Sequence, residues 1–179
     1  MGNGLDDLGD AFSSDWGATP ESASRDDFTA RVYRALEGDD TGELRRLAAG
    51  HPDWRGGDVF HDAVRRGSVE CVKVLLGLLG DDWANEPDEC GSTPLMYAAQ
   101  VNLLLVGLLV EAGADPNGLA EDFVEVDADC RFRSALFWAA LAGRQDVVEY
   151  LAPLTRPGLR HRVPELIRQR REQEARRRG

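Results

Sequence analysis

The feature that most constrains the fold is a segment that recurs along the chain. Residues 59–76 (VFHDAVRRGSVECVKVLL) align without a gap on residues 135–152 (ALFWAALAGRQDVVEYLA), and residues 94–110 (PLMYAAQVNLLLVGLLV) fit the same frame with one residue deleted. The alanine that all three copies share recurs after 35 and then 41 residues. Recurrence at this distance is typical of an array of small units stacked on one another.

Each copy is predicted to form two short helices. The first carries a small apolar face, such as Leu95 with Ala98, and the second carries apolar residues at helical spacing, such as Val72 and Leu75. A glycine, Gly67 in the first copy, allows the tight turn between them. Neither pair of helices could bury its apolar face alone, so the copies are expected to stack into an all-α solenoid.

The central copy strongly resembles an ankyrin repeat. It contains GSTPLMYAA at residues 91–99, in which Thr93-Pro94-Leu95 and Ala98 match the family's Thr-Pro-Leu-His-x-Ala signature and Met96 replaces the His. GADPN follows at residues 113–117. The preceding copy has that His as His61. The resemblance implies helix-turn-helix units joined by β-hairpin or loop fingers, in a protein that binds other proteins.

The same patterns divide the chain into three predicted segments. Residues 1–27 are expected to be an acidic disordered tail, because they are rich in Gly, Ser and Asp. Residues 28–155 are expected to be the ankyrin repeat domain, and residues 156–179 a basic capping helix and tail. The domain divides into four units, with a weak N-terminal capping unit first: residues 28–57, 58–90, 91–130 and 131–155.

Charge is distributed unevenly between these segments. The chain carries a net charge of −11, but residues 1–155 hold 29 acidic and 12 basic residues, whereas residues 156–179 hold three acidic and nine basic ones. So acidic a body argues against general binding to nucleic acids or to anionic membranes. A basic protein partner is favoured, and the protein is expected to be a monomer.

No pattern in the sequence points to catalysis, a cofactor or a metal. The three histidines and three cysteines are not at catalytic or metal-ligand spacing, and there is no Gly-rich phosphate loop. A Ca²⁺ site in the acidic loops is an alternative, although the Asp-x-Asp-x-Asp-Gly spacing is absent. His61 is expected to be structural. We predict a non-enzymatic cytoplasmic protein, since no leader or membrane-length apolar run is found, and the preference for Arg over Lys suggests a bacterial source.

Candidate partner-binding residues come from two features. In the ankyrin frame, the position after the signature His faces a concave groove, and large aromatic residues there are typical interface anchors. The loops at residues 80–90 and 118–130 together hold ten acidic residues and no basic one, which favours attraction of a cationic surface. Local packing of the aromatic residues and a merely solvated acidic face are the alternatives. The candidates are Asp62, Trp83, Tyr97, Trp138, Glu121, Asp122, Phe123, Glu125, Asp127 and Asp129.

Together these features predict a protein-protein interaction module that binds a partner through its concave face. An inhibitor or immunity factor for a basic toxin or nuclease is one specific form of this role. Two alternatives remain open: an adapter associated with nucleic acid through the Arg-rich C-terminal segment, and an enzyme using carboxylates on the long loop at residues 118–132.

Overall fold

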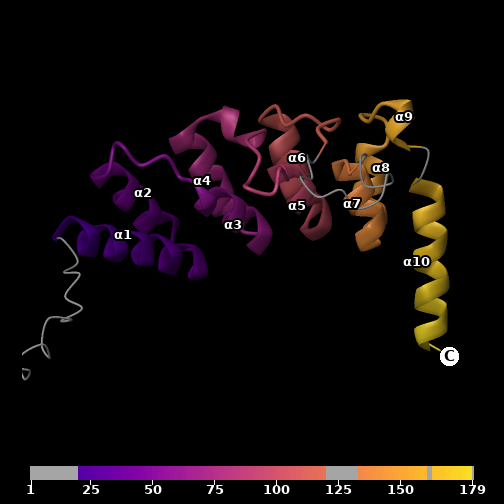
Figure 1. Ribbon diagram of the computed structural model, residues 1–179, viewed down its shortest axis with the longest axis horizontal. Helices are drawn as coiled ribbons and strands as arrows, with labels where there is room; N and C mark the ends of the chain where they lie inside the picture. Colours follow the sequence, from indigo (N-terminus) through magenta and orange to yellow (C-terminus); the bar gives the residue numbers. More distant parts are fainter. Residues whose placement is uncertain (1–19, 120–132, 161–162, 179) are drawn as a thin grey trace, which may run out of the picture.

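The computed structural model describes residues 20–119, 133–160 and 163–178, and within them the chain forms helices and no strand. Figure 1 shows them as successive layers of one elongated stack. In chain order they are α1 (Pro20–Glu37), α2 (Thr41–Gly50), α3 (Asp58–Arg66), α4 (Val69–Leu79), the short 3-10 helix η1 (Asp81–Ala84), α5 (Pro94–Val101), α6 (Leu103–Glu111), α7 (Ala135–Ala142), α8 (Gln145–Leu151), α9 (Pro157–Arg160) and α10 (Val163–Arg178).

Four antiparallel helix pairs make up the stack: α1 with α2, α3 with α4, α5 with α6, and α7 with α8. The first helices α3, α5 and α7 pack side by side in chain order, and the second helices α2, α4, α6 and α8 do the same (Figure 1). The predicted all-α repeat solenoid is therefore confirmed. The loop between α4 and α5 contains η1 instead of a β-hairpin, so the described finger is a loop.

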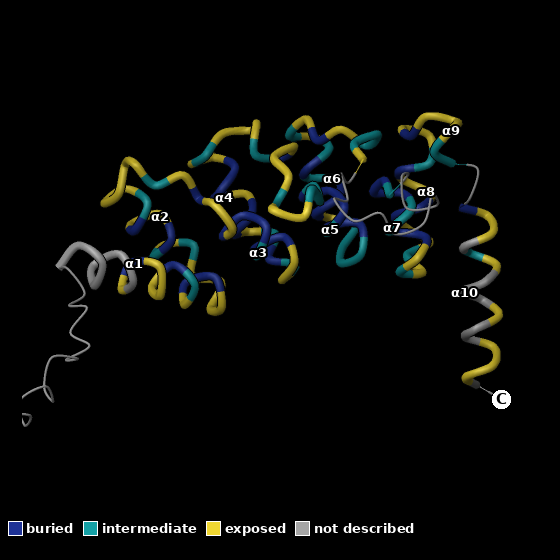
Figure 2. The backbone as a smooth tube through the Cα atoms, in the orientation of Figure 1, coloured by how far each residue is buried: buried dark blue, intermediate teal, exposed yellow. Residues whose placement is uncertain are grey.

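A single apolar core runs through the stack from unit to unit. The alanine of each repeat, Ala63, Ala98 or Ala139, is fully buried, with 0% of its surface exposed. A side chain of one carbon lets neighbouring first helices approach closely, and their larger residues fill the space beside it. Figure 2 shows this buried strip along the interior, with exposed residues on the outer turns.

The turn between the two helices of a unit explains the one-residue deletion in the central copy. In the outer copies Gly67 and Gly143 take the left-handed conformation, at φ 81° and 76°, and end the first helix there. The central copy has Asn102 instead, in extended conformation, and its side chain accepts a hydrogen bond of 2.8 Å from the amide of Leu104. A cap from Asn102 thus replaces the glycine turn.

The first helix begins earlier than the sequence pattern indicates. Helix α1 begins at Pro20, eight residues before the expected start at Phe28, and proline is favoured in the first turn because its fixed φ suits a helix. Phe28 is buried, with its ring centroid 3.9 Å from that of His51 and 5.8 Å from that of Trp54. These contacts anchor α1 to the segment after α2. Residues 1–19 of the expected tail lie outside the described residues, and the division into three segments stays a prediction.

The C-terminal helix covers the last repeat with its first turns only. Val163 of α10 is buried, Ile167 is partly buried against the core, and the helix packs against α7. Beyond these residues α10 extends past the edge of the stack (Figure 1). Val163 and Ile167 thus form the contact between α10 and the last repeat, and the capping role of residues 156–179 stays a prediction. Among the described residues, no helix combines the length and the apolar character needed to cross a membrane.

Candidate partner-binding face

Three candidate residues occupy matching positions on consecutive first helices. Asp62 lies on α3, Tyr97 on α5 and Trp138 on α7, and each side chain is half-buried. Because α5 packs between α3 and α7, the three residues form one row, which we call the first-helix row. Asp62 forms an ion pair with Arg65, whereas the other two positions are aromatic.

Two arginines on α3, Arg65 and Arg66, pair with acids of the same chain. Arg65 Nη1 donates to Asp62 Oδ1 at 2.9 Å, and Arg66 Nη2 lies 3.4 Å from Glu37 Oε1. Arg65 also donates through Nη2 to Asp88 Oδ2 at 2.9 Å. These arginines therefore serve contacts between neighbouring repeats, not a phosphate site. Exposed pairs of this kind contribute only about 0–1 kcal/mol each to stability.

Tyr97 is held by contacts within the chain. Its hydroxyl donates to Asp88 Oδ2 at 2.6 Å and accepts from Arg65 Nη2 at 3.1 Å. The guanidinium carbon of Arg65 lies 4.3 Å from the centre of the Tyr97 ring, which is cation-π geometry. Local packing, the alternative to partner binding, therefore accounts for the hydroxyl end of Tyr97, which is bound to the adjacent loop.

Asp88 links the loop after η1 to the first-helix row. Its side chain is 7% exposed, and Oδ1 accepts hydrogen bonds of 2.9 Å from the amides of both Cys90 and Ser92. Burial raises the pKa of this carboxyl, but the hydrogen bonds from Tyr97, Ser92 and Cys90 outweigh burial and hold the pKa below its ordinary value. In the sequence, Asp88 is only one of five acids in its loop. The sequence feature that could have distinguished Asp88 from the other acids is its position three residues before Gly91, a glycine in a turn.

Trp138 differs from Tyr97 because its polar end has no acceptor among the described residues. The indole Nε1 is buried and makes no hydrogen bond to another described residue. The ring packs against the core, and the guanidinium carbon of Arg133 lies 5.6 Å from the centre of the ring. A buried donor without an acceptor costs about 1–3 kcal/mol.

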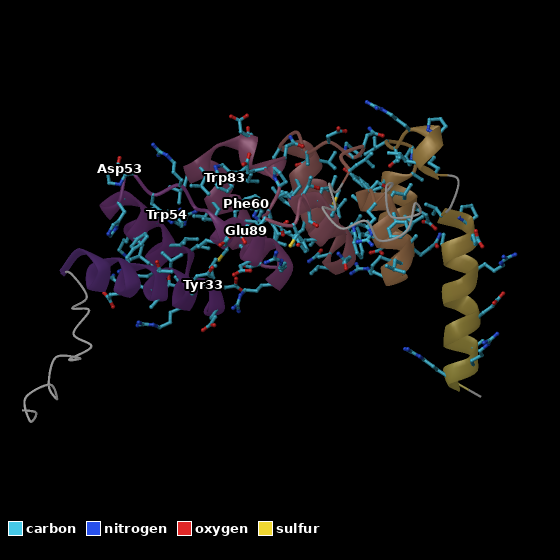
Figure 3. The ribbon with its side chains drawn as sticks, in the orientation of Figure 1. Tyr33, Asp53, Trp54, Phe60, Trp83 and Glu89 are labelled. Atoms are coloured by element: carbon cyan, nitrogen blue, oxygen red, sulfur yellow. The ribbon has the colours of Figure 1, made fainter. Side chains whose placement is uncertain are left out.

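Trp83, the other described candidate, does not join this row. Trp83 lies on η1, and its ring centroid is 6.1 Å from that of Phe60, so it packs on the core (Figure 3). In the first acidic loop Asp81, Asp82, Glu86 and Glu89 are exposed. The candidates of the second loop lie outside the described residues: Glu121, Asp122, Phe123, Glu125, Asp127 and Asp129.

His61 has the structural role expected from its place in the repeat. It is buried on α3, and its Nε2 lies 3.0 Å from the carbonyl oxygen of Glu86 in the next loop. Burial lowers the pKa of His61 and outweighs the opposing effects of that carbonyl and of the Asp88 carboxylate. His61 therefore ties a first helix to the following loop in its neutral form.

His61 should make the protein less stable in mild acid. Its pKa is lower in the folded protein than the ordinary value of 6.5, so its stabilisation is complete above about pH 6.5 and is lost as the pH falls towards the folded value. One such group changes the free energy of unfolding by at most about 1.4 kcal/mol per pH unit. Urea unfolding of wild type and His61→Gln between pH 7.5 and 5.5 measures this, and parallel profiles for the two proteins would contradict it.

Among the described residues, no three His, Cys, Asp or Glu side chains come together in a way that could hold a metal ion. Cys71 is buried and Cys90 exposed, and neither forms a disulfide. Burial raises the pKa of the Cys71 thiol, which disfavours the reactive thiolate. The geometry of the described residues therefore offers surfaces for binding, and the first-helix row is the most organised of them.

A stack of helix pairs that presents a row of side chains beside projecting loops defines the class of helical-repeat binding solenoids. The sequence profile of ankyrin repeats, in three copies, matches residues 23–120 and, in a second match, residues 60–160. The chain belongs to the ankyrin repeat family. Ankyrin repeats generally act as protein-protein interaction modules, which supports a protein partner for this chain.

Proposed function

We propose that this protein docks a partner protein on its concave ankyrin face, with Trp138 as the principal apolar anchor. The observation that carries the proposal is the first-helix row itself, with Asp62, Tyr97 and Trp138 on three stacked helices. The row offers charge at one end and aromatic area at the other. Tyr97 has its hydroxyl satisfied internally, so it contributes ring surface, whereas the indole N–H of Trp138 has no acceptor among the described residues.

The acidic loops steer the partner in this proposal. Asp81, Asp82, Glu86 and Glu89 are exposed, and no ion pair joins them to another described residue. Unpaired charges of one sign raise the local potential and increase the rate of encounter with a basic protein. An inhibitor or immunity-type role towards a basic toxin or nuclease fits such a surface, because blocking a cationic active site needs only tight docking.

Capture experiments with matched variants test which face binds. Wild type, Trp138→Ala and Leu104→Ala are immobilised and exposed to an extract of the source organism. Leu104 is the control, because it lies on second helix α6 with 70% of its surface exposed. We expect a partner retained by wild type and by Leu104→Ala but lost by Trp138→Ala, with all three showing the same circular dichroism. Equal capture of the partner by wild type and by Trp138→Ala would exclude the first-helix row as the binding site.

Binding kinetics with the captured partner then separate anchoring from steering. Trp138→Ala should raise the dissociation rate about 30-fold, equivalent to about 2 kcal/mol, with little dependence on salt. Neutralising Asp122, Glu125, Asp127 and Asp129 to Asn or Gln should instead lower the association rate about tenfold at low salt. That loss should shrink above about 0.15 M salt, where charges are screened within about 8 Å. A wild-type association rate for the neutralised variant at low salt would show that this loop is merely solvated.

A further inference from the structure

Three described arginines of the C-terminal helix make no ion pair with the described residues of the repeat stack. Arg168, Arg176 and Arg177 of α10 are exposed, and none of the ion pairs among the described residues involves them. The i,i+4 spacing of Glu172 and Arg176 favours a pair, but the described structure forms none between them. We call these three arginines the α10 cationic surface. They lie along about 14 Å of helix, at 1.5 Å per residue, and at 3.6 residues per turn they spread over about half of its circumference, so the charge is presented around the exposed part of α10.

The chain carries one described surface of matching chemistry. Asp81, Asp82, Glu86 and Glu89, in the loop between α4 and α5, are exposed and also unpaired among the described residues. We call these four residues the α4–α5 acidic loop. Two unpaired surfaces of opposite sign on one chain attract each other between copies, even where they cannot meet within a copy.

The fold prevents the two surfaces from meeting within one molecule. Helix α10 packs on α7 at the C-terminal end of the stack, and its cationic part runs beyond the edge of the last repeat (Figure 1). The α4–α5 acidic loop belongs to the middle of the stack, separated from α10 by the α5–α6 and α7–α8 pairs. Val163 and Ile167, which pack against the core, fix where α10 leaves the stack.

We propose that α10 is a self-association element, and that its cationic surface docks on the α4–α5 acidic loop of a second copy. The contact is heterologous, because different surfaces of the two copies meet, so it joins copies head to tail. Its strength comes from exposed ion pairs, which are individually weak and sensitive to salt. The association is therefore concentration-dependent at low ionic strength, whereas the sequence led us to expect a monomer. It does not depend on the partner proposed above.

Charge reversal provides the test. Sedimentation velocity of the full chain at about 20 mM salt should show association that weakens at least about tenfold by about 300 mM, because the screening length falls from roughly 20 Å to about 6 Å. Arg168→Glu/Arg176→Glu/Arg177→Glu should be monomeric at both salt concentrations, and so should Asp81→Lys/Asp82→Lys/Glu86→Lys. An equimolar mixture of the two variants should associate, because every contact between unlike variants joins surfaces of opposite sign, either the wild-type pair or the reversed pair. The chain that carries both reversals should associate like wild type.

The same proteins distinguish docking of α10 on a second copy from binding of α10 to nucleic acid. Glu70→Lys/Glu149→Lys is the control variant, since Glu70 and Glu149 are exposed acids on second helices outside the loop, and it should keep wild-type association. Wild type that remains monomeric at low salt overturns the proposal, and so does association that survives either reversal. Binding of a fluorescent single-stranded oligonucleotide that is lost in the α10 reversal, without self-association of wild type, would assign α10 to nucleic acid instead.

Discussion

Replacing Asp88 by alanine is expected to lower the free energy of unfolding by about 2–3 kcal/mol. The carboxylate, 7% exposed, accepts hydrogen bonds from the Tyr97 hydroxyl, from Arg65 and from two loop amides. A buried donor that loses its acceptor costs about 1–3 kcal/mol, although Arg65, with 42% of its side chain exposed, can turn to water. Urea or thermal unfolding measures the change.

Glu89→Ala is the matched control, because Glu89 is an exposed acid in the same loop with no ion pair to another described residue. It should change the free energy of unfolding by no more than about 0.5 kcal/mol. Since the folded protein lowers the pKa of Asp88, the difference between wild type and Asp88→Ala should be complete above about pH 4 and disappear as the pH falls through the folded value. Equal unfolding midpoints for the two variants would show that the Asp88 network does not stabilise the fold.

Removing residues 156–179 is expected to destabilise the protein by about 2–4 kcal/mol and to promote aggregation. The deletion exposes the side of α7 that α10 covers and removes Val163 and Ile167 from the core. Burial of one aliphatic side chain is worth about 1.5–3 kcal/mol, part of which the released helix recovers as conformational entropy. A repeat stack with an uncovered end loses both stability and solubility.

Two shorter deletions test whether the loss of stability comes from the contact of α10 with the last repeat or from other terminal residues. Removal of residues 172–179 leaves Val163 and Ile167 in place and should leave the melting temperature within about 2 °C of wild type. Removal of residues 1–18 ends before α1 begins at Pro20 and should likewise change little. If the chain without residues 156–179 melts at the temperature of the intact protein, α10 does not stabilise the last repeat.

Several parts of the proposed binding face could be predicted from sequence because they repeat in register. The position after the signature His falls on the first helix of each unit, so the repeat pattern alone predicts that Asp62, Tyr97 and Trp138 share one face. The partners of these side chains could not be predicted in the same way. Asp88 was one of five acids in its loop, and only the approach of α3 to that loop selects it to bind both Arg65 and Tyr97.

The sequence by itself determined the repeating unit, the helix pairs and their order, because the spacing of apolar residues and turn signals acts over a few residues. It also determined that small alanines lie where first helices meet. Only the tertiary structure decided that Tyr97 is bound by Asp88 and Arg65, that Trp138 has an indole N–H without an acceptor among the described residues, and that α10 leaves the stack after Ile167. These outcomes depend on contacts between residues distant in the chain, whose relative positions are fixed only when the repeats stack.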